Sequence, residues 1–394
     1  MLDSTKTKQA QDLRPITLLQ PAKIAFGAGC SLQAADDLKN RGLKSVAIFA
    51  SEPTRFLTDS LIAKLEEEQF TIHVHAGKAA EPTFQDAVEA AAWLEQTGAQ
   101  AVIGFGGGSV IDVAKIASAT AHQDAPLDNY VGNGLLPKRT LPLFAIPTTA
   151  GAGSEASPNA IFLDTEAQLK KGVISPWLMP DAAYVDPELT YSLPASITAA
   201  TALDALSHCV EAYANRNAHP LVDVYALKGT ELIFNNLAAA LENSRDTQAR
   251  SALALGSLYG GLCLGPVNTA AIHALSYPLG SEYHVPHGLS NAVLMPHVLR
   301  FNAATSPERY AQLAQSLGLG DPNATTENLA ERFIKAIEQL CVDCSITSTL
   351  SDFGVSQSDV PRMAASAITI QRLLVNNLRE LSQADAEGIY QNAF

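Results

Sequence analysis

The character of this chain changes at Pro194, and this change restricts the fold more than any other feature of the sequence. Before Pro194, short apolar runs alternate with amphipathic stretches. Short apolar strands separated by helices are typical of a parallel sheet with helices on both faces. The pattern predicts strands at 45–50, 71–75, 101–105 and 143–146, and helices at 59–69, 83–97 and 110–120.

After Pro194 the strand-like runs nearly vanish, and long stretches rich in alanine and leucine follow. Both residue types have high helix propensity, so these stretches favour helix. We therefore expect two domains, an α/β domain at 1–194 and an all-helical domain at 195–394. Helices of the second domain are predicted at 198–214, 221–243, 247–264, 268–276, 306–317, 326–341, 357–366 and 369–378.

Composition excludes several classes of partner. The net charge of −14 argues against nucleic acid and anionic membranes, because both need a basic protein surface. No apolar run approaches the roughly 18 residues of a membrane helix, and the start of the chain lacks the apolar core of a signal peptide. We therefore expect a cytoplasmic protein. Five scattered cysteines indicate free thiols, and we interpret the one close pair, Cys341 and Cys344, as incidental because it follows a predicted helix.

A glycine-rich loop at 104–109, G-F-G-G-G-S, follows a predicted strand and precedes a predicted helix. Glycines let backbone N–H groups approach a pyrophosphate closely, and the helix N-terminus adds a favourable field for the anion. A tight turn without a ligand is the alternative, but the strand before and the helix after favour nucleotide phosphate. In that helix, Asp112 fits a first-turn acid and Lys115 fits a surface charge.

A second loop at 147–155, P-T-T-A-G-A-G-S-E, again follows an apolar strand. Its hydroxyls and free amides lie at the carboxyl end of that strand, where open α/β sheets bind their ligands. Alone, such a loop is unremarkable; beside the glycine-rich loop it is a second candidate for ligand contact.

The helical half contains one pair with the spacing of metal ligands. Asp204 and His208 are four residues apart in a stretch without proline or glycine, so on a helix both side chains leave the same face. Two further imidazoles, His273 and His287, are available to complete a site of four ligands. The alternative interpretation is an ordinary hydrogen bond on the helix surface, which is the commoner role of an i, i+4 pair.

The sequence around these residues resembles that of the iron-containing (group III) alcohol dehydrogenase family. The resemblance extends over nearly the whole chain, from about Pro21 to the C-terminus, with the motifs in the family's order. The motifs are G-G-G-S-V-I-D-V-A-K, P-T-T-A-G-A-G-S-E, D-P-E-L-T, A-L-D-A-L-S-H-C-V-E-A-Y and H-A-L-S-Y-P-L-G-S-E-Y-H-V-P-H-G-L-S-N-A-V-L-M-P-H-V-L-R-F-N.

The resemblance implies a dehydroquinate synthase-like fold, with an N-terminal nucleotide-binding α/β domain, a C-terminal helical domain and the active site between them. It implies hydride transfer between NAD or NADP and a small alcohol or aldehyde. We also expect a homodimer or larger homo-oligomer. The family's metal ligands fall on Asp204, His208, His273 and His287. Its cofactor contacts fall on Gly107, Gly108, Ser109, Thr148, Thr149, Ser157, Asn159 and Lys171.

The chemistry of these residue types agrees with that implication. A divalent ion held by protein ligands polarises a carbonyl and stabilises an alkoxide. Three imidazoles and one carboxylate suit Fe²⁺ and Zn²⁺ almost equally, so the metal stays open. Glu211 lies seven residues after Asp204 and shares its helix face. It either supports a metal ligand or is a plain solvated acid.

The chain departs from the family pattern at the position thought to relay a proton. Four residues after the third ligand the family often has a histidine, and here Tyr277 stands there. His284, three residues before the last ligand, occupies a place where many members have a non-basic residue. We therefore expect Tyr277 or His284 to carry the proton, although a phenol with an ordinary pKa near 10 is a different acid from imidazole.

The cofactor site departs from the pattern as well. Where the family often has an aspartate that holds the adenosine ribose of NAD, this chain has Ser51 followed by Glu52. A serine leaves room for the 2′-phosphate of NADP and the neighbouring acid repels it, so the choice between NAD and NADP stays open. Glu81 replaces the asparagine of an N-P-T run, which puts that cofactor contact in doubt.

Two other functions compete with an alcohol dehydrogenase. One is a branch of the same family that reduces a semialdehyde or a keto acid, for which Arg300 and Lys171 are candidate partners of the substrate carboxylate. The other is a non-catalytic nucleotide-binding or metal-sensing protein on the same scaffold, because fold does not fix function. Turnover of an aldehyde with NADH or NADPH separates the enzyme from the non-catalytic protein.

Overall fold

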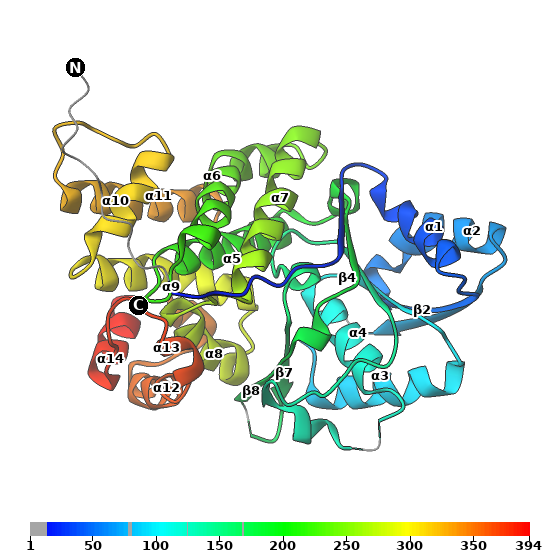
Figure 1. The fold of residues 1–394 in the computed structure, drawn as a ribbon. Coiled ribbons are helices and arrows are strands. Elements are labelled where there is room, and N and C mark those ends of the chain that lie inside the picture. The colour runs from blue at the N-terminus through cyan, green and yellow to red at the C-terminus, as the bar shows by residue number, and fades with distance from the viewer. Residues whose placement is uncertain (1–13, 78–80, 124, 168) are drawn as a thin grey trace.

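The structure is a computed structural model that describes residues 14–77, 81–123, 125–167 and 169–394, and Figure 1 shows its two halves side by side. The expectation about a signal peptide concerns mainly residues 1–13, which lie outside the described residues. Within the described ranges, no helix has both the length and the apolar character needed to cross a membrane.

The N-terminal half is built on a six-stranded sheet whose neighbouring strands are all parallel. The strand order is β1-β9-β6-β4-β2-β3. The edge strand β1 and its neighbour β9 were not predicted from the sequence. The strands are β1 (Lys23–Phe26), β2 (Ser45–Ser51), β3 (Thr71–Gly77), β4 (Val102–Gly106), β6 (Leu143–Pro147) and β9 (Ala182–Val185).

Alternate residues of the central strands pack into different cores. In β2, Val46 and Ile48 contact a cluster that includes α1 (Gln33–Asn40) and α2 (Asp59–Glu67). The intervening Ala47 and Phe49 belong to a second cluster with the helices of the other face, α3 (Phe84–Thr97) and α4 (Gly108–Thr120). Both faces of the sheet are therefore buried, which explains why its strands read as continuous apolar runs.

A second sheet of three strands lies next to α3 and α4, in the order β5-β8-β7. It consists of β5 (Gly132–Asn133), β7 (Asn159–Asp164) and β8 (Leu169–Ile174), with β7 and β8 antiparallel. The sequence analysis did not predict it. Its strands are half exposed and carry charged residues, so they lack the continuous apolar run of a central strand.

The C-terminal half is helical and forms one large hydrophobic cluster. The last strand of the main sheet ends at Val185, and α5 begins at Ala195, so the predicted boundary at 194 falls in the connection between them. The helices are α5 (Ala195–Tyr213), α6 (Pro220–Glu242), α7 (Thr247–Leu264), α8 (Ala271–Tyr283), α9 (His287–Ala303), α10 (Pro307–Ser316), α11 (Thr326–Asp343), α12 (Val360–Ala367), α13 (Gln371–Leu374) and α14 (Gln383–Gln391).

Helices α1 and α14 were not predicted, and two further differences from the predicted helices occur at prolines. Helix α8 continues through Pro278, beyond the predicted end at residue 276, and α9 was not predicted although it contains only one proline, Pro296. Proline removes a backbone donor and is expected to end a helix, but tertiary packing overrides this local signal here. In the opposite direction, the helix predicted at 369–378 is reduced to the short α13.

The five cysteines are free and buried. Cys341 lies in the last turns of α11 and Cys344 follows the helix directly, as the sequence pattern indicated. Burial raises the pKa of the Cys341 thiol to about 12. Because a thiol of high pKa is a weak nucleophile, this environment supports the interpretation of the pair as incidental.

Candidate metal and nucleotide site

The four candidate ligands come from three helices that pack against one another. Asp204 and His208 lie one turn apart in the middle of α5, His273 lies in the first turn of α8, and His287 is the first residue of α9. Contacts of α9 with both α5 and α8 bring the three segments together. Asp204, His208 and His273 are buried, whereas about a third of the His287 side chain is exposed to the cavity described below.

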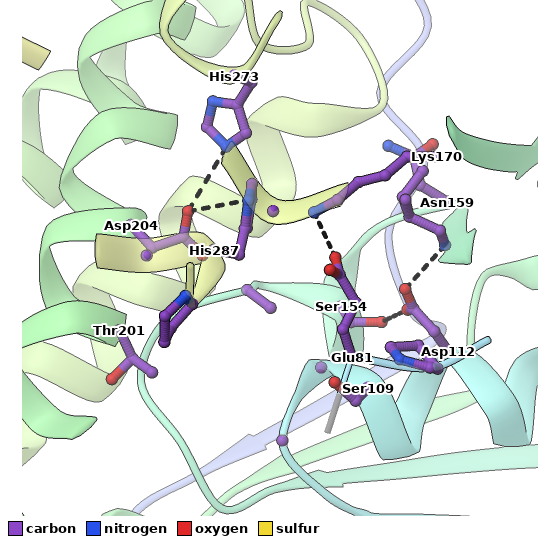
Figure 2. Close-up of a pocket in the computed structure, with 18 of the residues that line it drawn as sticks. Glu81, Ser109, Asp112, Ser154, Asn159, Lys170, Thr201, Asp204, His273 and His287 are labelled. Carbon is purple, nitrogen blue, oxygen red and sulfur yellow. Dashed lines mark hydrogen bonds and ion pairs between the residues drawn. The ribbon is translucent and has the colours of Figure 1, made fainter. Parts of the chain in front are cut away.

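One carboxylate oxygen is the centre of this cluster. The Nε2 atoms of His208 and His287 each lie 3.7 Å from Asp204 Oδ1, and His273 Nε2 lies 3.5 Å from it (Figure 2). These distances are too long for hydrogen bonds. They fit ligands of one ion, since atoms about 2.1 Å from a tetrahedral centre lie roughly 3.4 Å apart. Ligand atoms of Asp204, His208 and His273 all lie within 4.8 Å of one another.

Glu211 supports one of the imidazoles. Its Oε2 accepts a hydrogen bond from His273 Nδ1 at 2.6 Å, and its Oε1 accepts one from the backbone N–H of Ile272 at 2.6 Å. A proton on Nδ1 leaves the Nε2 lone pair free to face Asp204, which is the arrangement of a metal-ligating histidine held by a carboxylate. Of the two roles considered for Glu211, the structure therefore favours support of a ligand over that of a solvated acid.

The charged groups of the cluster shift one another's pKa values, and burial lowers those of His208 and His287. Burial by itself lowers the pKa of His273, but Glu211 and Asp204 outweigh burial and raise it to about 10. Burial alone would raise the pKa of Asp204. The neighbouring imidazoles lower it by more than burial raises it, so the pKa of Asp204 lies well below the usual range. The carboxylate of Asp204 and three imidazoles thus form a donor set that fits a divalent cation, with Glu211 behind His273.

Asn291 is a member of the cluster that the sequence analysis missed. It is fully buried in α9, and its amide nitrogen donates to Asp204 Oδ1 at 2.8 Å. It lies four residues after His287, so a helix beginning at 287 would have placed both side chains on one face. Because α9 was not predicted, the spacing of His287 and Asn291 did not identify Asn291 as a member of the cluster.

The glycine-rich loop brings the start of α4 against the second predicted loop. Gly107 caps the helix and Gly108 is its first residue. A Cβ on Gly108 would lie 2.5 Å from the Cβ of Ala152, and a Cβ on Gly107 would lie 3.3 Å from Thr149. The absence of side chains therefore lets the two loops approach closely, and an anion at this helix N-terminus would meet free N–H groups.

Asp112 and Lys115 are buried structural groups rather than surface charges. Asp112 accepts hydrogen bonds from the Ser154 hydroxyl and from the backbone N–H of Ile161. Lys115 is fully buried, and its Nζ donates to the carbonyl oxygens of Ser157 and Asn159 at 2.8 and 2.7 Å. Burial lowers the pKa of Lys115 to about 8. These contacts tie the loop at 147–159 to α4, which corrects the interpretation of Lys115 as a surface charge.

One cavity of about 710 Å³ joins the ligand cluster to the glycine-rich loop. Figure 2 shows Asp204, His273 and His287 on one side of it and Ser109, Asp112, Ser154 and Asn159 on the other. From the N-terminal half, the predicted residues that line it are Gly107, Gly108, Ser109, Thr149, Ser157 and Asn159. From the C-terminal half they are Asp204, His208, His273, Tyr277, His284 and His287.

Three predicted cofactor residues do not line this cavity. Thr148 is buried beneath it, with its backbone N–H bonded to Gly106, and the Ser51 hydroxyl at the end of β2 bonds to that of Thr54. Lys171 pairs with Asp164 at 2.7 Å on the other face of the small sheet. Its neighbour Lys170 lines the cavity instead, since successive residues of a strand point to opposite faces, and a cofactor contact by Lys171 stays a prediction.

The two candidates for the proton relay both lie in the cavity, but in different surroundings. Tyr277 is buried, and its hydroxyl accepts a hydrogen bond from Arg372 at 2.7 Å. Its ring centre lies 6.3 Å from that of His287. His284 is exposed and ends α8 with a left-handed backbone at φ 56°. Arg300, a candidate partner of a substrate carboxylate, instead pairs with Glu338 and Glu331 outside this cavity.

Comparison with known proteins identifies the family. Residues 21–187 match the model of the iron-containing alcohol dehydrogenase domain, and residues 198–394 match the C-terminal domain of the Fe-containing alcohol dehydrogenase family. The chain belongs to the iron-containing alcohol dehydrogenases. It is thus an oxidoreductase of the NAD(P)-dependent class that acts on alcohols and aldehydes, and the resemblance noted in the sequence is confirmed.

Relatives within this family differ in the substrates that their names give. The chain is 35% identical to long-chain-alcohol dehydrogenase 1 of Geobacillus thermodenitrificans, over 95% of this chain and 97% of that protein. It is 34% identical to sulfoacetaldehyde reductase of Bilophila wadsworthia, over 92% and 94%. A crystal structure of 1,3-propanediol oxidoreductase superposes with a TM-score of 0.93 at 30% identity, covering 97% of this chain and all of the other. The expected two-part α/β and helical fold is confirmed.

Proposed function

We propose that this alcohol dehydrogenase holds a divalent cation, Fe²⁺ or Zn²⁺, with Asp204, His208, His273 and His287, and transfers hydride between NAD or NADP and a small alcohol or aldehyde. The observation that carries the proposal is the convergence of three imidazole Nε2 atoms on Asp204 Oδ1 at 3.5–3.7 Å, in the cavity that also contains the glycine-rich loop. In the reducing direction the balance is aldehyde + NAD(P)H + H⁺ giving alcohol + NAD(P)⁺.

The residues of the chain divide the work along the cavity. Gly107, Gly108 and Ser109 offer backbone donors to the cofactor pyrophosphate at the start of α4. Glu211 fixes the orientation of His273, and Asn291 fixes the carboxylate of Asp204. When bound, the cation polarises the carbonyl oxygen and the nicotinamide supplies or accepts the hydride.

The proton that the oxygen gains or loses needs a carrier beside the ligand cluster. The ring centre of Tyr277 lies 6.3 Å from that of His287, and its hydroxyl accepts a hydrogen bond from Arg372. His284 is exposed and lines the same cavity. We assign the relay to one of these two side chains. The preference between NAD and NADP, the cytoplasmic location and the homo-oligomeric state expected from the sequence stay predictions.

The test is a panel of aldehydes and semialdehydes with NADH and with NADPH, after the protein is loaded with Fe²⁺ or Zn²⁺. We expect turnover that disappears on chelation and returns on addition of metal, and we expect H273A to lose bound metal, measured by elemental analysis. Activity that survives complete removal of metal would contradict the ligand assignment. Comparison of the turnover rates with NADH and with NADPH at equal concentration shows which of the two cofactors the enzyme prefers.

A further inference from the structure

Charged side chains of the cavity lining gather around Tyr277, next to the ligand cluster. Two cations face the Tyr277 ring: Lys170 Nζ lies 4.9 Å from its centre, and the Arg372 guanidinium carbon lies 5.5 Å from it. Both cations line the cavity together with Glu81, whereas the Asp204 carboxylate belongs to the ligand cluster itself. One negative charge thus stands against two positive charges around Tyr277.

The two cations differ in their partners. Lys170 is almost fully buried, and its ammonium group pairs with Glu81 across the cavity (Figure 2). Arg372 is exposed, and among the described residues its polar partner is the uncharged hydroxyl of Tyr277. Several other arginines of the chain meet carboxylates; Arg300 and Arg309 are examples. The guanidinium of Arg372 therefore retains N–H donors for a ligand in the cavity.

The position of Arg372 suits the far end of a short substrate. The Tyr277 ring neighbours both groups, with 5.5 Å between the guanidinium carbon and the ring centre and 6.3 Å between the ring centres of Tyr277 and His287. A substrate whose oxygen lies at the ligand cluster and whose chain runs along Tyr277 would bring its other end to Arg372. A guanidinium binds planar and tetrahedral oxyanions through paired hydrogen bonds.

We propose that Arg372 determines specificity for aldehydes that carry a terminal anionic group, a carboxylate or a sulfonate, separated from the carbonyl by a short chain. This inference rests on the proposed function and specifies its substrate class. Lys170 contributes to the local field, while Glu81 keeps it from binding the anion directly. Arg300 and Lys171 were first considered as partners of the substrate carboxylate. In this proposal that role belongs to Arg372 in α13.

The experiment compares matched substrates in the metal-loaded enzyme: succinic semialdehyde, its neutral methyl ester, and sulfoacetaldehyde. We expect the wild-type KM for succinic semialdehyde to be about tenfold to a hundredfold below that for the ester, the range of a hydrogen bond between charged groups. R372Q should remove this difference by raising the KM of the anionic substrate much more than that of the ester, whereas loss of the contact with Tyr277 would affect kcat for both substrates alike. R372K should restore part of the difference. The sulfonate arm shows which anion is preferred.

R300Q is the matched control, because it removes the same charge from an exposed arginine outside the cavity. R300Q should change neither KM nor kcat for the acid or for the ester. A binding measurement adds a readout without turnover: with oxidised cofactor present, 4-hydroxybutyrate should raise the melting temperature of the wild type and not that of R372Q.

Two results would overturn the inference and leave the proposed function intact. One is an equal loss of activity toward the acid and the ester in R372Q, which would mean that the arginine only supports Tyr277. The other is a wild-type enzyme that reduces the ester as well as it reduces the acid. Absence of turnover with every aldehyde would instead contradict the proposed function itself.

Discussion

Glu211 Oε2 and His273 Nδ1 lie 2.6 Å apart in a fully buried contact between α5 and α8. The carboxylate belongs to the same helix as Asp204 and His208, so one helix supplies two ligands and orients a third. Removal of this contact tests whether the cluster works as a metal site.

We expect E211Q to weaken metal affinity about tenfold to a hundredfold, because the amide no longer holds the Nδ1 proton and the ring loses its fixed orientation. The measurement is competition with a chelator of known affinity, followed by elemental analysis. E231Q, on the exposed face of α6, is the control and should bind metal like the wild type. Unchanged affinity in E211Q would mean that His273 is oriented without Glu211.

The proton relay is tested by Y277F and H284A. Loss of a general acid or base lowers kcat by about a hundredfold or more, so the variant that removes the relay should lose at least about tenfold in kcat. Y283F is the control, since the hydroxyl of that nearby tyrosine bonds to Arg362 and does not line the cavity. If neither Y277F nor H284A reaches tenfold, the relay assignment fails.

Close approach of the two cofactor loops is tested by G108A. The added Cβ would lie 2.5 Å from the Cβ of Ala152, so either α4 or the facing loop must shift. We expect KM for the nicotinamide cofactor to rise at least about tenfold, because small displacements at a binding site are costly. G388A, in α14, has no atom within 4 Å of the new Cβ and should behave like the wild type. Normal cofactor kinetics in G108A would separate this loop from the cofactor site.

Glu155 makes stability depend on pH. Burial raises its pKa from 4.5 to about 7. Between these values the folded protein holds a proton that the unfolded chain has released, so stability is fully present below about pH 4.5 and falls as pH rises through 7. The loss is about 3 kcal/mol at 1.36 kcal/mol per pKa unit.

E155Q should remove that loss, because a neutral amide does not ionise. We expect the melting temperature of E155Q, relative to the wild type, to rise steadily from pH 5 to pH 7, whereas E67Q, at an exposed position of α2, should show no such trend. A constant difference between E155Q and the wild type across this range would contradict the raised pKa.

Local patterns were sufficient where structure repeats along the chain. The strands β2, β4 and β6 are short apolar runs buried on both faces, the edge strand β3 is half-buried, and most helices of the second half follow from their composition. Local patterns failed where packing overrides them. Helices α8 and α9 pass through Pro278 and Pro296, and the half-exposed β7 and β8 show no continuous apolar run.

The sequence by itself determined the division into an α/β half and a helical half, because hydrophobic periodicity is a local property. It also named Asp204 and His208 through residue type and spacing, and the resemblance to the family added His273 and His287 to the ligand set. Only the tertiary structure decided which side chains meet: that Glu211 holds His273, that Lys170 rather than Lys171 faces the cavity, and that Arg372 reaches Tyr277. Those contacts join residues up to 95 positions apart, and their geometry is set by how helices and sheets pack rather than by any neighbour in the chain.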